Sequence, residues 1–98
     1  MEKIVRDGMV AVAVSYGFGA GWSTWNDVDP MDARFNQLFL DGKVDEAKAL
    51  CDELDLGYTG GANDVEIVWL PVGTEFIITE YDGSEGLELK DETPWRTA

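Results

Sequence analysis

The sequence predicts an α+β domain: a mainly antiparallel sheet of about four strands with a two-helix hairpin on one face, in the order β-α-α-β-β-β. Three observations predict this class. A short stretch near the start that is apolar on both faces indicates a strand. Two central segments repeat apolar residues at helical spacing. Short strand-like stretches separated by turn signals then complete the chain. With 98 residues the chain is expected to form a single domain, residues 1–98, in which residues 91–98 form a flexible polar tail.

The first strand is expected over residues 9–16, where both faces are largely apolar, as is typical of an interior strand. The loop that follows, residues 16–26, concentrates glycines, aromatic rings, hydroxyls and an amide. Glycines cost backbone entropy on folding, and a simple connection between two elements does not need them. We therefore predict that this loop is the functional surface. Its candidate ligand- or partner-binding residues are Tyr16, Phe18, Gly19, Gly21, Trp22, Ser23, Thr24, Trp25 and Asn26.

Two helices are expected after the loop. Asp29 has the residue type of an N-cap, Pro30 suits the first helical position, and Gly42 suits the end of the helix. The second helix is expected over residues 44–56. Its apolar stripe includes Cys51, which is expected to be a small core residue rather than a nucleophile. Its outer face is acidic, and the predicted acidic surface consists of Asp45, Asp52 and Glu53.

The last three strands are expected over residues 65–70, 74–81 and 86–90. Asp82 and Gly83 form the dipeptide that most strongly indicates a short hairpin. Both faces of these strands carry apolar side chains, whereas two helices can cover only one face. The uncovered face predicts a homo-oligomer or a surface for a partner.

Charge is the strongest global feature. The chain has 20 acidic and 7 basic residues, a formal net charge of -13. This composition opposes direct binding to nucleic acid, because phosphate contacts require clustered Lys and Arg. It is compatible with a basic partner, including a protein surface that normally holds nucleic acid, although for an ordinary domain a solvated surface that keeps the protein soluble is the preferred interpretation. No apolar run could span a membrane and a single cysteine fits a reducing compartment, so a cytoplasmic protein is expected.

The side chains available limit the chemistry. The chain has no histidine, so the commonest general base and zinc ligand is missing. Ser23 and Thr24 have no identifiable base nearby, which disfavours a catalytic triad. Asp27, Asp29 and Asp32 could hold Mg²⁺ or Ca²⁺ through oxygen ligands, but helix capping is the preferred role. We therefore predict a protein that is not an enzyme and that uses no metal or cofactor.

The aromatic residues of the loop leave two interpretations open. Phe18, Trp22 and Trp25 could stack on a nucleobase while loop amides contact phosphate, although the Gly-x-Gly-x-Gly spacing lacks the context of a dinucleotide fingerprint. Alternatively, the two tryptophans close the open end of a small core. We predict a split, in which Trp25 packs inward and Trp22 faces the ligand or partner.

The segment 17–26, Gly-Phe-Gly-Ala-Gly-Trp-Ser-Thr-Trp-Asn, resembles small bacteriophage and prophage proteins of no established activity. Residues 58–61, 70–76 and 80–85 resemble the same proteins, so the similarity covers most of the chain after Val10. The resemblance implies a phage accessory protein in the cytoplasm of a bacterial host. Such proteins often disarm host enzymes or defence systems, and several acidic ones imitate nucleic acid.

Three functions follow as hypotheses. The first is a non-catalytic accessory protein that binds and inhibits a host protein or complex, of the defence or nucleic-acid-handling kind. The second is a binding protein that sequesters a nucleotide or another small ligand in the glycine-tryptophan loop. The third is a small enzyme that depends on carboxylates or a metal.

Overall fold

A computed structural model describes residues 1–89 of the chain. The elements are β1 (Val5–Arg6), β2 (Met9–Ser15), α1 (Ala33–Leu40), α2 (Val44–Glu53), the 3-10 helix η1 (Gly60–Asp64), β3 (Val65–Pro71), β4 (Phe76–Tyr81) and β5 (Ser84–Leu89). The predicted α+β class is confirmed. The predicted tail at residues 91–98 lies outside the described residues.

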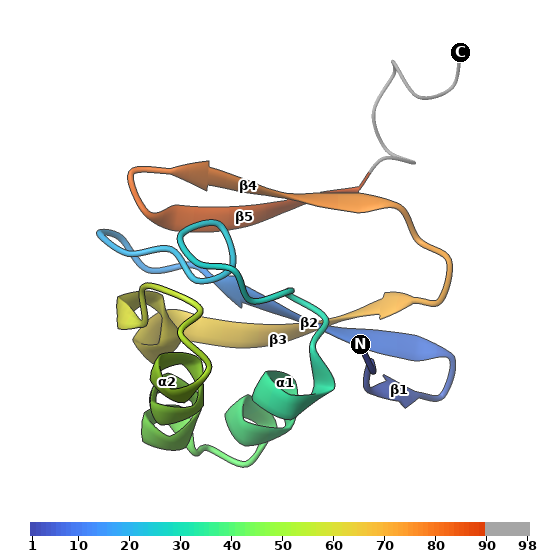
Figure 1. Cartoon of the computed structure of the whole chain (residues 1–98). Helices are drawn as coiled ribbons and strands as arrows, with labels where there is room; N and C mark the ends of the chain where they lie inside the picture. Colours follow the sequence, from blue (N-terminus) through green and yellow to red (C-terminus); the bar gives the residue numbers. More distant parts are fainter. Residues whose placement is uncertain (90–98) are drawn as a thin grey trace.

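The strands form two antiparallel sheets rather than one. One sheet has the order β1-β2-β3, and the other is the β4-β5 hairpin. Figure 1 shows three layers: α1 and α2 cover one side of the β2-β3 pair, and the β4-β5 hairpin lies on the other side. The predicted helical hairpin on one face is therefore present, and the last two strands form a layer of their own.

Each face of the β2-β3 pair has its own apolar core. On the helical side, Ala13 is small enough for Trp22 and Phe35 to pack against the sheet, with Ala47 and Cys51 of α2 in the same cluster. The prediction that Cys51 is a core residue is confirmed, since its side chain is fully buried. The second core joins residues of β2 and β3 to residues of the hairpin: Val12, Val14, Val68, Leu70, Phe76, Ile78, Leu87 and Leu89.

The β4-β5 hairpin covers the sheet face that a second copy of the chain was expected to cover. After β3 the Val72 N–H donates to the carbonyl of Gly8 at 2.8 Å, so the chain runs toward the β1-β2 turn instead of folding back to pair with β3. β4 consequently crosses the open face of the sheet. The argument for a homo-oligomer from an uncovered face no longer applies, and the homo-oligomer stays a prediction.

The first helix begins later than expected. Asp32 is the N-cap of α1, because its side chain accepts a hydrogen bond from the Arg34 N–H at 2.9 Å. The prediction of Asp29 as N-cap is wrong. Its carboxylate accepts from the Met31 N–H at 2.8 Å, and the Pro30 carbonyl accepts from the Ala13 N–H at 2.8 Å. These bonds fix residues 29–31 as a turn against β2 and leave them unable to form the first helical turn.

Two Asp-Gly dipeptides close hairpins in the structure. Asp82 and Gly83 both have positive φ, 52° and 87°, as a two-residue type I′ turn requires, which confirms the predicted β4-β5 turn. Asp7 and Gly8 have φ of 53° and 75° and join β1 to β2 in the same way. The sequence analysis did not predict this second hairpin, although the same dipeptide signals it.

Candidate functional site

The glycine-tryptophan loop lies at one end of the molecule, near η1 and the turn of the β4-β5 hairpin (Figure 1). We call this region the loop end and define it as residues 16–26, 57–64 and 80–85. A Cβ atom on Gly61 would collide with the backbone of Gly21, and one on Gly83 would collide with Gly19 and Ala20. The glycines thus allow three backbone segments to pack against one another, as close approach requires.

A buried carboxylate holds the loop end together. Glu85 of β5 is only 2% exposed. Its Oε1 accepts a hydrogen bond from the Ser15 N–H at 2.9 Å. Its Oε2 accepts from the N–H groups of Trp22 at 2.8 Å and Thr24 at 3.0 Å, and from the Thr24 hydroxyl at 2.6 Å. These donors satisfy a carboxylate that would otherwise be costly to bury.

Glu85 also completes the edge of β2. Along that edge the Ala13 N–H donates to the carbonyl of Pro30, and the Ser15 N–H donates to Glu85. This residue was missed because the last strand was expected to begin at residue 86, two positions after the start of β5 at Ser84. A signal was present: Glu85 alternates with Leu87 and Leu89, so it shares their inward face.

The predicted split between the two loop tryptophans is wrong in direction. Trp22 is fully buried, and its indole makes edge-on contacts with Phe35 and Phe39, at centroid distances of 5.8 and 5.3 Å. Trp25 is 40% exposed. The reason is the hydrogen bond between the Trp22 N–H and Glu85, which turns this part of the loop toward the helices. Trp22 is therefore unable to stack on a ligand without local unfolding.

Trp25 forms an exposed aromatic pair with Tyr58, which is 50% exposed. Their ring centroids are 5.4 Å apart and the ring planes are tilted by 55°. Glu80 lies beside them, and its Oε2 accepts from the Trp25 indole N–H at 3.3 Å and from the Gly83 N–H at 2.7 Å. We call Trp25, Tyr58 and Glu80 the aromatic corner. Of its members, the sequence analysis singled out only Trp25.

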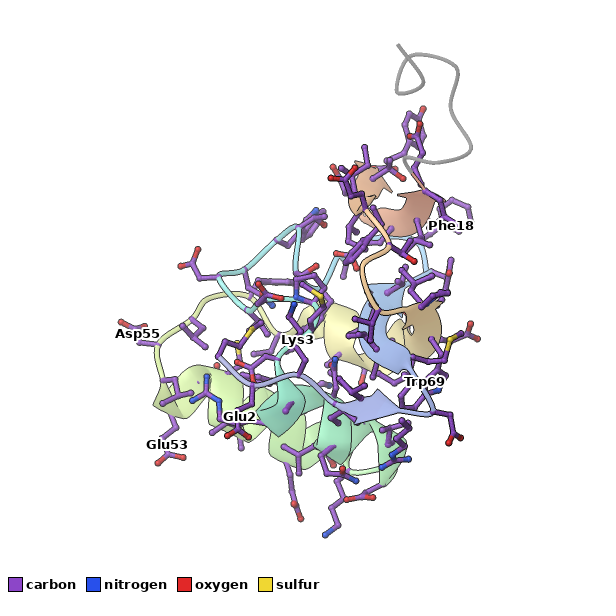
Figure 2. The ribbon with its side chains drawn as sticks, turned by 90° about the vertical axis from the view of Figure 1, so that its right-hand side faces the viewer. Glu2, Lys3, Phe18, Glu53, Asp55 and Trp69 are labelled. Carbon is purple, nitrogen blue, oxygen red and sulfur yellow. The ribbon has the colours of Figure 1, made fainter. Side chains whose placement is uncertain are left out.

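The remaining predicted loop residues serve different purposes. Phe18 is 84% exposed and lies toward the hairpin layer, whereas Glu53 and Asp55 lie toward the helical layer (Figure 2). Tyr16 is also exposed, and its carbonyl accepts from the Ser84 hydroxyl at 3.1 Å. Asn26 has a structural role, since its side chain donates to the carbonyl of Tyr58 at 2.9 Å. Gly21 is buried, and Ser23 is half-buried.

Thr24 has a carboxylate neighbour that the sequence analysis did not identify. Its hydroxyl lies 2.6 Å from Glu85 Oε2, so the expectation that no base lies near this part of the loop is wrong. A nucleophile of this kind also needs donors to stabilise an oxyanion. The nearby N–H groups of Trp22 and Thr24 already donate to Glu85, so the geometry is that of a structural anchor.

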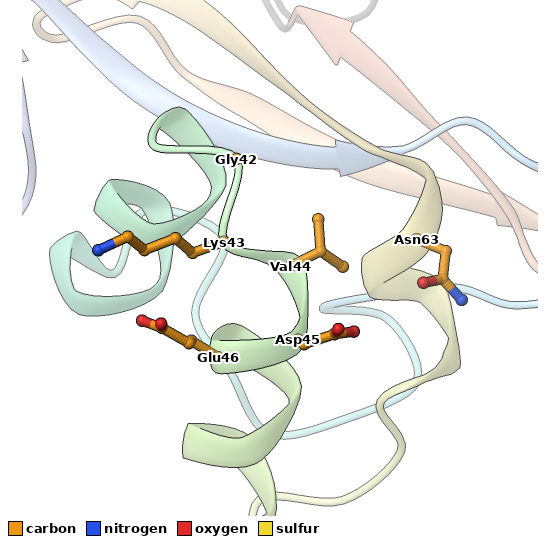
Figure 3. A pocket seen from close by; sticks show the side chains of 6 residues that line it. All are labelled: Gly42, Lys43, Val44, Asp45, Glu46 and Asn63. Carbon is orange, nitrogen blue, oxygen red and sulfur yellow. The ribbon is translucent and has the colours of Figure 1, made fainter.

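The predicted acidic surface lies on α2. Asp45, Asp52 and Glu53 are all exposed. Asp45 also lines a cavity of about 290 Å³ at the start of the helix, beneath Asn63 of η1 and opposite the side chains of Lys43 and Glu46 (Figure 3). The cavity is lined by polar groups of both charges. It offers no distinct site for a single ligand.

The loop end has an unbalanced charge. No Lys or Arg occurs among residues 16–31, 54–66 and 80–89, whereas these segments contain acidic residues. The exposed members of that set include Asp27, Asp55, Asp64, Glu80 and Asp82. A surface of exposed aromatic rings and uncompensated carboxylates attracts cations.

The other titratable groups have structural roles. Burial acts to raise the pKa of Asp32, but hydrogen bonds from the Arg34 side chain and N–H and the charge of Arg34 outweigh it and lower that pKa. Burial, with the charges of Asp52 and Asp27, raises the pKa of the Cys51 thiol. Within residues 1–89, no three Asp, Glu or Cys side chains gather as a metal site would require.

Neither α1 nor α2, nor any other helix within residues 1–89, has the length and apolar composition that crossing a membrane demands. The chain matches no protein-family model, no curated protein and no solved structure. The loop end and the acidic surface are therefore the features of the molecule that bear on its function.

Proposed function

We propose that this protein is a non-catalytic binding protein that attaches through its acidic surfaces to a basic surface of a partner protein. On the resemblance to phage proteins, the partner is a bacterial host protein of the defence or nucleic-acid-handling kind, and binding inhibits it. The single observation that carries the proposal is the exposed negative charge, which the described residues leave uncompensated. Asp45, Asp52 and Glu53 make no ion pair with residues 1–89.

The occupied amides of the loop favour this proposal over the capture of a nucleotide. A phosphate-binding loop presents free N–H groups to its ligand. Here the N–H groups of Ser15, Trp22 and Thr24 donate to the chain's own carboxylate, Glu85. An incoming phosphate would have to displace that carboxylate and would meet an acidic surface. Trp22, a candidate for stacking on the base, is buried in the core.

The same bonds count against the enzyme hypothesis. Thr24 and Glu85 lie close enough for proton transfer, but the donors that would stabilise a developing negative charge are engaged. Backbone N–H groups of Ser15, Trp22 and Thr24 donate to Glu85 and hold the Thr24–Glu85 pair in place.

Capture from bacterial lysate tests the proposal. The immobilised protein should retain a host protein at low salt and release it as ionic strength rises, because exposed charge pairs are screened. A variant with Asp45→Asn, Asp52→Asn and Glu53→Gln should retain less of it. If the partner handles nucleic acid, added duplex DNA should compete for the same basic surface and release it.

A matched control separates the acidic surface from general charge loss. Glu2→Gln, Asp7→Asn and Asp41→Asn remove the same number of exposed carboxylates from other parts of the chain. The proposal is contradicted if the captured protein binds equally at low and high salt, and equally to both triple variants and the wild type.

A further inference from the structure

We propose that the aromatic corner, Trp25, Tyr58 and Glu80, receives an arginine side chain from a basic segment of the partner protein. This inference rests on the proposed function and deepens it by naming a contact and the chemistry of the group bound. The guanidinium would stack on the exposed rings and donate to the carboxylate of Glu80.

The rings pack closely over two glycines, which leave room for them. A Cβ atom on Gly21 would lie 2.7 Å from Cδ1 of Trp25, and a Cβ atom on Gly60 would lie 2.6 Å from the ring of Tyr58. Asn26 adds a further restraint, because its side chain donates to the carbonyl of Tyr58. The two tilted rings are therefore positioned before any partner binds, which lowers the entropy cost of binding.

The carboxylate is also positioned in advance. Glu80 Oε2 accepts from the Trp25 indole N–H and the Gly83 N–H, while Oε1 makes no hydrogen bond to residues 1–89. A fixed carboxylate with one oxygen that the described residues leave unbonded, next to two half-exposed aromatic rings, matches both recognition modes of a guanidinium. Arginine stacks on aromatic rings and donates to carboxylates in a planar geometry, whereas the lysine ammonium is a more strongly hydrated point charge.

Charge complementarity favours a basic segment as the occupant. The segments that form the loop end contain no Lys or Arg of their own that could fill the corner. The acidic residues Asp52, Glu53 and Asp55 precede Tyr58 in the chain, so a basic segment could contact them after placing one arginine in the corner.

The test is the affinity of the full chain for a fluorescein-labelled peptide of alternating arginine and glycine, measured by fluorescence anisotropy at low salt. Glu80→Gln should weaken binding by about two- to fivefold, as expected for an exposed cation–π site and its ion pair. Tyr58→Leu, which keeps apolar bulk over Gly60 but removes the π face, should weaken binding by a similar factor. A peptide with lysine in place of arginine should bind less tightly, and one with neutral citrulline should lose binding.

Asp7→Asn is the control, since it removes one exposed charge from the β1-β2 turn and leaves both the corner and the acidic surface of α2 intact. If Glu80→Gln and Asp7→Asn weaken peptide binding equally and Tyr58→Leu has no effect, the corner is not a site, although the acidic surface can still bind basic partners. If the arginine peptide does not bind even at low salt, both this inference and the proposed function fail. Thermal melts identify any variant that has unfolded. If Glu80→Gln unfolds, the affinity of Tyr58→Leu tests the inference, and if Tyr58→Leu unfolds, the affinity of Glu80→Gln does.

Discussion

The carboxylate of Glu85 accepts a hydrogen bond from the backbone N–H of Trp22 at 2.8 Å, and this contact joins residues 63 positions apart in the chain. It places one tryptophan in the core and leaves the other, Trp25, at the surface. The same carboxylate also accepts from the N–H groups of Ser15 and Thr24, so these three amides are not available to an anionic ligand. Both the stability of the loop end and the choice among functions depend on this carboxylate.

Replacing Glu85 should therefore destabilise the protein strongly. Glu85→Ala leaves three backbone N–H groups without their acceptor, and each buried unpaired donor costs ~1–3 kcal/mol, so we expect a loss of about 3 kcal/mol or more in the free energy of unfolding. Glu85→Gln keeps one acceptor oxygen and should cost less, about 1–2 kcal/mol. Denaturant unfolding gives both values.

Glu88→Gln is the control on the same strand and should change stability by less than about 0.5 kcal/mol. If Glu85→Ala is as mild as Glu88→Gln, the carboxylate does not organise the loop end.

The two loop tryptophans should differ when they are truncated. Trp22→Ala removes a fully buried ring from the helical core and should cost about 3–5 kcal/mol. Trp25→Ala removes a ring that is 40% exposed and should cost about 1 kcal/mol, within the ordinary range for single substitutions. Denaturant melts of the single variants measure the difference, and equal losses would contradict the assigned positions.

The sequence predicted the class and most elements because their signals are local. A short run that is apolar on both faces identified β2, Gly42 marked the end of α1, and Asp82-Gly83 marked the hairpin. The division into two sheets depends on how the chain turns after β3, which no local pattern specifies. A strand that is apolar on both faces is expected to be buried on both, but its sequence does not identify the element that covers each face.

The sequence singled out the loop as the candidate site, but it did not identify the residues from other segments that contact the loop. The glycines and tryptophans drew attention to a loop that the structure packs against Gly61 and Gly83. Glu85, Glu80 and Tyr58 come from distant segments, and their contacts with the loop depend on tertiary packing. The reversal of the two tryptophans has the same origin, because a carboxylate from β5 sets the direction of the loop.

The pH dependence of stability should reveal the pair of Asp32 and Arg34. The pKa of Asp32 is lowered in the folded state, so its stabilising contribution is present above the unfolded pKa of about 3.9 and is lost as pH falls through the folded pKa. Arg34→Gln removes the side-chain hydrogen bonds and the charge of Arg34 but keeps its backbone N–H donor, so the pKa of Asp32 should rise. The acid-unfolding midpoint should then move to higher pH.

Lys43→Gln is the matched control for that change, because it removes one exposed positive charge from the start of α2. Circular dichroism across an acid titration measures both midpoints. Equal shifts in the two variants would mean that net charge, rather than the pair with Asp32, sets the resistance to acid.

The central claim is that the loop end is a preformed surface for a basic segment and that the amides of Trp22 and Thr24 are closed to phosphate. An amide and indole NMR titration of the ¹⁵N-labelled chain tests it most directly, with the arginine peptide as one ligand and ATP as the other. The account predicts that the peptide shifts the Trp25 indole N–H and the Gly83 amide, both of which donate to Glu80, while ATP leaves the amides of Trp22 and Thr24 unchanged. Saturable shifts of the Trp22 and Thr24 amides with ATP, and no response of the aromatic corner to the peptide, would contradict it.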